Sequence, residues 1–98
     1  MSKKEVDDTF WGRADSFIEK ANEFNDHVSA GKVSSSLLYA AARFNSFIVS
    51  SSAESAEEME QDKEAAIEYF VGQFRKMLEE NLDDHIENFS AYNETKNS

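Results

Sequence analysis

The chain contains no cysteine and no proline, and only three of its 98 residues are glycine. The absence of cysteine excludes disulfide bonds, thiol nucleophiles and metal centres held by thiolates, and it suits a reducing compartment. The absence of proline, with so little glycine, leaves nothing that would interrupt long helices. We therefore expect an all-helical cytoplasmic protein.

Long apolar runs and a basic surplus are also missing. The longest uninterrupted apolar run covers residues 37–42, far short of the roughly 20 residues that span a bilayer. The N-terminus passes from basic to acidic residues without the apolar region of a signal peptide. A formal net charge of −10 is expected to repel nucleic acid and anionic membranes. It could steer a basic protein partner, or make the chain a DNA mimic, although a solvated acidic surface explains it more simply.

The stretch 37–49 is apolar nearly all round a helical wheel, which predicts a buried helix at 35–52 with neighbours on at least two sides. Before it, Phe10, Phe17 and Phe24 recur every seventh residue, which is typical of a helix that packs along others. We expect this first helix at about 8–29, with Asp7, Asp8 or Thr9 as its cap. Gly31 is predicted to end it, and Ser34, Ser35 or Ser36 to cap the second helix.

Two overlapping capping boxes precede the third segment, Ser51 with Glu54 and Ser55 with Glu58, and we favour the second. A helix is then predicted from about 56 to 89, with a break near 81–84 and a short fourth helix as the alternative. Its apolar stripe follows three- and four-residue steps and consists of Ile67, Phe70, Val71, Phe74, Met77, Leu78, Leu82, Ile86 and Phe89.

The predicted fold is therefore all-α, with three long antiparallel helices and the second, at 35–52, in the centre. We expect one domain over 1–98, with disordered ends at 1–6 and 93–98.

Four polar residues fall among the predicted apolar faces and form a candidate pocket: Arg43, Asn45, Asn81 and His85. Arg43 could bind an anion, but an ion pair with Asp15 or Glu68 is the simpler interpretation. His85 could be a metal ligand or a general base, but a hydrogen-bonded, half-buried imidazole explains it better.

Patterns that carry catalysis or metal binding are missing around these residues. Neither His27 nor His85 follows a glutamate by three residues, as di-iron bundles require. The acidic run at 54–64 lacks the spacing of a calcium loop, and no strained glycine elbow accompanies the serines. We expect no enzymatic activity, no metal and no cofactor.

Three blocks of sequence, at 10–18, 32–53 and 69–89, are similar to a family of short bacterial proteins catalogued as a domain of unknown function. The similarity extends from about residue 7 to residue 92. It implies a bacterial, cytoplasmic protein, and it assigns no activity or cofactor to any residue.

We therefore expect a non-enzymatic protein–protein interaction module that forms a homodimer. The third predicted helix is longer than the first two, which would leave its apolar end uncovered within one chain. Leu78, Leu82, Ile86 and Phe89 are the candidate interface. The alternative is a small-molecule binder or enzyme built on the four-residue polar pocket.

Overall fold

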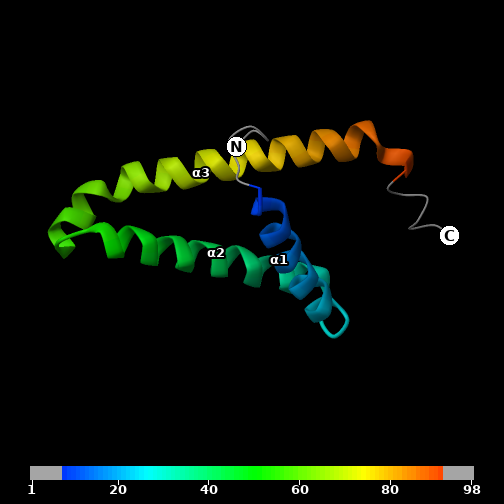
Figure 1. Cartoon of the computed structure of the whole chain (residues 1–98), viewed down its shortest axis with the longest axis horizontal. Coiled ribbons are helices and arrows are strands. Elements are labelled where there is room, and N and C mark those ends of the chain that lie inside the picture. The colour runs from blue at the N-terminus through cyan, green and yellow to red at the C-terminus, as the bar shows by residue number, and fades with distance from the viewer. Residues whose placement is uncertain (1–7, 92–98) are drawn as a thin grey trace. The chain divides into compact units, whose positions relative to one another are not determined.

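The computed structural model describes residues 8–91, and all the regular structure among them is helical. Helix α1 spans Phe10–Asn25, α2 spans Ala30–Ser52 and α3 spans Ala56–Glu87 (Figure 1), with a further helical turn at 89–91. The all-α prediction with three long helices is confirmed. The described chain divides into two units, 8–61 and 62–91. The single domain over 1–98 stays a prediction, and the ends at 1–6 and 93–98 lie outside the described residues.

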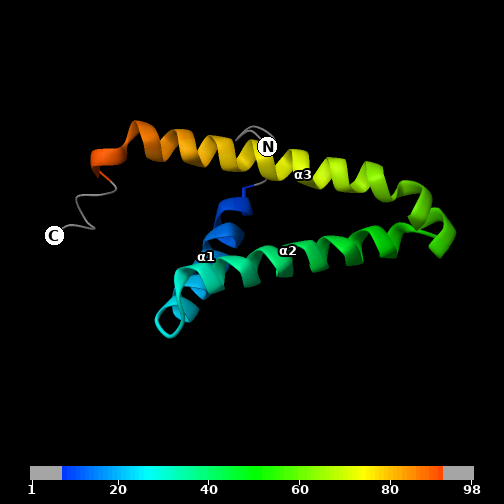
Figure 2. The same cartoon turned by 180° about the vertical axis from the view of Figure 1, so that it is seen from behind.

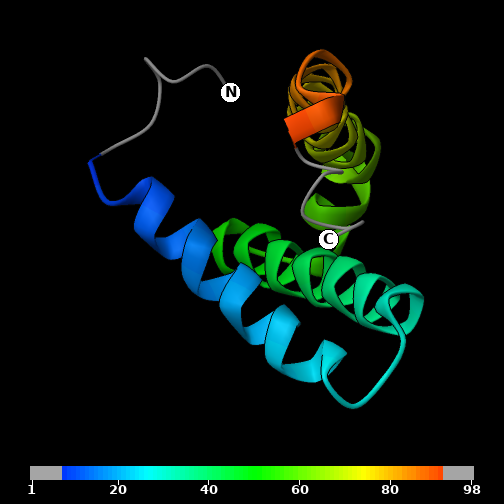
Figure 3. The same ribbon diagram turned by 90° about the vertical axis from the view of Figure 1, so that its right-hand side faces the viewer.

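Helices α1 and α2 form a hairpin joined by the turn at 26–29. Helix α1 crosses the first part of α2 obliquely (Figure 3). On α1, Phe10, Ala14 and Ala21 are half-buried, and on α2 Val33 is 9% exposed and counts as buried. Val33 is the only buried residue among those described. The hairpin thus buries little apolar surface between its two helices.

The turn between α1 and α2 lies earlier than the sequence predicts. Gly31 does not end the first helix, because α1 stops at Asn25 and Gly31 is already inside α2. The described glycines all have negative φ, so Gly31 does not adopt the left-handed conformation of a helix C-cap. Ser29 caps α2 instead of Ser34, Ser35 or Ser36, since its hydroxyl accepts from the Lys32 amide at 3.4 Å. The predicted cap was wrong because a glycine in the first turn costs a helix little.

The start of α3 agrees with the predicted capping box. The Glu58 amide donates to Ser55 Oγ at 3.1 Å, and Glu58 Oε2 accepts from the Glu54 amide at 3.1 Å. The carboxylate thus reaches one residue further back than in the standard box. Both bonds satisfy donors at the positive end of the helix dipole.

Helix α3 continues through residues 81–84 without interruption (Figure 2). The Asn81 side chain donates to the Met77 carbonyl at 2.7 Å, so the asparagine bonds along its own helix and does not start a new one. The alternative of a break near 81–84 is therefore wrong.

The predicted burial of the second helix is not met within the described chain. Phe44 is 66% exposed, Phe47 58% and Leu38 56%. The wheel analysis was correct that this stretch is apolar nearly all round. Within the unit 8–61 helix α1 contacts α2, and a neighbour on a second side of α2 stays a prediction.

Replacing the residue that caps α3 tests how much the cap stabilises that helix. We expect Ser55→Ala to lower the free energy of unfolding by about 0.5–2 kcal/mol, because the Glu58 amide loses its acceptor. Urea unfolding followed by circular dichroism measures the change.

Ser46→Ala is the matched control. The Ser46 hydroxyl donates to the Ala42 carbonyl at 2.9 Å in the middle of α2, where alanine is the better helix former. We expect it to be neutral or slightly stabilising. Equal losses in both variants would show that Ser55 has no special capping role.

Candidate functional site

Large apolar side chains lie mostly on the surface of the described chain. Soluble monomers rarely expose so many of them together, because burying apolar area is the main favourable term in folding. On α3, Ile86 is 72% exposed, and on α1 Phe17 is 68% exposed. The exposed set comprises Trp11, Phe17, Ile18, Phe24, Val28, Leu37, Leu38, Tyr39, Phe44, Phe47, Ile48, Ile67, Tyr69, Val71, Phe74, Leu78, Leu82, Ile86 and Phe89.

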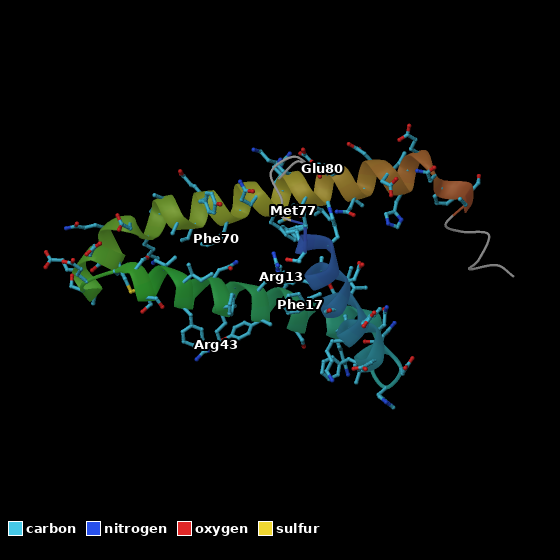
Figure 4. The ribbon with its side chains drawn as sticks, in the orientation of Figure 1. Arg13, Phe17, Arg43, Phe70, Met77 and Glu80 are labelled. Carbon is cyan, nitrogen blue, oxygen red and sulfur yellow. The ribbon has the colours of Figure 1, made fainter. Side chains whose placement is uncertain are left out.

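The candidate interface residues all belong to the C-terminal part of α3 and the turn that follows. Leu78 is 44% exposed, Leu82 52% and Phe89 65%. Together with Ile86 they follow one another at three- and four-residue steps on one side of the helix. We call these four residues the α3 apolar strip. Phe70 and Met77 lie on α3 before the strip (Figure 4), and both are half-buried.

The polar residues of α2 make a different contact from the predicted one. The Arg43 guanidinium lies 5.5 Å from the centre of the Phe47 ring, which is cation–π distance. The structure thus places an aromatic ring, and not the carboxylate of Asp15, beside this cation. Asn45 is half-buried. Arg43 itself is exposed (Figure 4).

Asn81 and His85 lie on α3, and both are exposed. The Asn81 amide bonds to a backbone carbonyl of its own helix, and His85 lies in the last turn of α3. Arg43 and Asn45 belong to the first unit of the chain and Asn81 and His85 to the second. A pocket made by all four stays a prediction.

The described charges are solvated. Lys20 pairs with Glu23 at 3.1 Å and Arg75 with Glu79 at 3.0 Å, each within one helix and each largely exposed. Pairs of this kind contribute about 0.2–1 kcal/mol. Residues 8–91 hold no group of three or more histidines and carboxylates suited to a metal ion. No described helix has an apolar stretch long enough to cross a membrane.

Sequence reasoning missed the aromatic surface of α1. The seven-residue spacing predicted that Phe17 and Phe24 pack along other helices, whereas Phe24 is 54% exposed and Trp11 50%. The alanines at positions 14 and 21, which lie seven residues apart, are the half-buried side of this helix. Small residues at that spacing were the available signal, since they mark the side on which a neighbouring helix approaches closely.

Fold and surface together define a small all-helical protein with an exposed apolar surface. The chain belongs to the family described as "Protein of unknown function (DUF3144)", whose model matches residues 10–86. It is also similar to the protein NB7890A from Shewanella sp., solved by NMR, with 35% sequence identity and a TM-score of 0.77. That match covers 92% of this chain and 96% of the Shewanella chain. No curated protein matches.

The acidic surface gives a prediction for salt dependence. Carboxylates crowd residues 54–68 and 79–87 in a chain of net charge −10, and added salt screens their mutual repulsion. We expect the Tm to rise between low and moderate sodium chloride, as measured by circular dichroism. A Tm that falls with salt would mean that ion pairs such as Arg75–Glu79 outweigh the repulsion.

Proposed function

We propose that this protein is a non-enzymatic interaction module that self-associates as a homodimer through its exposed apolar surface, with the α3 apolar strip at the interface. One observation carries the proposal: among the described residues a single side chain, Val33, is buried, while large apolar side chains are exposed on all three long helices.

The energetics of folding support this proposal. Ordering a residue costs about 1–2 kcal/mol of backbone entropy, and burial of apolar surface at roughly 25 cal/mol per Å² is the main term that offsets it. Isolated helices of about 12–15 residues are marginal in water, and α1 has 16 residues. A second copy is the simplest source of the missing buried area, because most soluble oligomers are built from identical chains.

The charge and composition support two further parts of the proposal. A net charge of −10 favours a basic protein as any additional partner, since complementary potentials raise association rates. The absence of cysteine supports a reducing, cytoplasmic location.

The contacts of the polar residues do not favour the small-molecule alternative. Asn81 already donates to a backbone carbonyl, and Arg43 lies over an aromatic ring. Both groups would have to leave these partners to reach a ligand.

Light scattering during gel filtration at micromolar concentration tests self-association. We expect a mass of twice 11.1 kDa for the wild type. Leu82→Glu should give a soluble protein near 11.1 kDa, because a carboxylate in an apolar interface is desolvated without a partner.

Tyr69→Glu is the matched control, since Tyr69 is an equally large exposed side chain, 60% accessible, on a different side of α3. We expect it to remain dimeric. A wild type at 11.1 kDa would overturn the proposal, and dissociation of both variants would move the interface away from the strip.

A further inference from the structure

Helix α2 carries no carboxylate, although the chain as a whole is rich in them. All 20 aspartates and glutamates lie outside residues 27–53, whereas the cations Lys32 and Arg43 lie within α2. The acidic residues of α1 are Asp15, Glu19 and Glu23, and α3 is acidic at both ends. Among the three long helices, α2 is therefore the one that an acidic surface can approach without meeting like charges.

The same helix exposes a row of large apolar side chains. Leu37, Phe44 and Ile48 follow one another at steps of seven and four residues, so they lie on one side of α2, with Phe47 beside them. Each of the four is at least 44% exposed. We call these four residues the α2 apolar row. It is about 16 Å long, enough to cover the strip from Leu78 to Ile86, which is about 12 Å long.

Acidic side chains border the α3 apolar strip along one edge. Glu79 and Asp83 lie three residues before Leu82 and Ile86, which makes them neighbours on the helix surface. Two strips in contact would gather the carboxylates of both copies around one interface, which like-charge repulsion opposes. A more favourable partner for the strip is an apolar surface that is free of carboxylates.

Arg43 adds a cation to the edge of the α2 apolar row. Its guanidinium lies 5.5 Å from the centre of the Phe47 ring, and the side chain is exposed. A carboxylate that approaches the row meets this cation, and their attraction is stronger where apolar contacts exclude water. The α2 apolar row therefore complements the α3 apolar strip in charge as well as in hydrophobicity.

We propose that the α3 apolar strip of one copy packs on the α2 apolar row of a second copy, with Arg43 close to the carboxylates beside the strip. This inference rests on the proposed self-association and names the surface that receives the strip. A second, equivalent contact with the roles exchanged closes the dimer about a two-fold axis. The net charge of each copy still opposes their approach at long range.

Paramagnetic broadening in NMR spectra tests the contact, and the chain has no native cysteine to interfere with labelling. A spin label on Ser51→Cys lies three residues beyond Ile48, on the side of the row. The spin-labelled protein is mixed with isotope-labelled wild type, so that only contacts between copies broaden the observed amide signals. We expect broadening at residues 78–86.

Ser46→Cys is the matched control, because Ser46 lies on the opposite side of α2 from the row. Its spin label should broaden the same signals less. Light scattering checks that each labelled variant keeps a mass of twice 11.1 kDa. Where the label at Ser51 lowers this mass, Ser36→Cys at the other end of the row replaces it.

Charge reversal tests the role of Arg43. We expect Arg43→Glu to raise the dimer dissociation constant about tenfold more than Lys63→Glu does. Lys63 is exposed on α3, outside the row and the strip, and both variants change the net charge equally. Sedimentation equilibrium measures the two constants.

The outcomes separate this inference from the proposed function. A dimeric mass without broadening at 78–86 would overturn the contact with α2 and leave self-association standing. Equal dissociation constants for the two charge-reversal variants would overturn the placement of Arg43 beside the strip. A wild-type mass of 11.1 kDa would overturn self-association and the contact together.

Discussion

The shortage of buried apolar surface is the constraint on which the rest of this structure depends. Val33 is buried, and most of the other large apolar side chains of the described helices are exposed. Hydrophobic burial is the term that normally offsets conformational entropy. The proposed self-association would supply this term from contacts between two copies. Under that proposal the stability of the helices would depend on protein concentration.

The helices themselves are encoded locally. Ser29 and Ser55 cap two of them, and serines inside α2 bond to the carbonyl one turn earlier, as Ser51 does to Phe47 at 2.7 Å. Lys20 and Glu23 add a pair within a single turn. A cap contributes about 0.5–2 kcal/mol and an exposed ion pair about 0.2–1 kcal/mol. Together they decide where helices begin and end, but they hold no helix against another.

The contrast between interactions within one helix and contacts between helices explains what the sequence could predict. The Ser55 start of α3 and its continuity through 81–84 follow from signals within a few residues, and both are confirmed. The predicted position of the turn between α1 and α2 was wrong because two local signals compete there. Gly31 favours a helix end and Ser29 favours a helix start, and the structure follows Ser29. Burial at 37–49 was misjudged because periodicity identifies an apolar face without identifying the chain that covers it. The candidate polar pocket has the same weakness, since it needs the relative placement of two units.

Charge and apolar surface act against each other in this chain. Every copy carries a net charge of −10, so two copies repel at long range, while their apolar surfaces attract only at contact. An interface is favoured where opposite charges lie close together. The acid-rich start of α3, with Glu57 and Glu58 in its first turn, is unsuited to self-association. The C-terminal part of the same helix combines the apolar strip with two basic residues and five acidic ones: Arg75, Lys76, Glu79, Glu80, Asp83, Asp84 and Glu87. Any self-association through the strip therefore has to overcome the repulsion between these carboxylates, which is why salt should favour it.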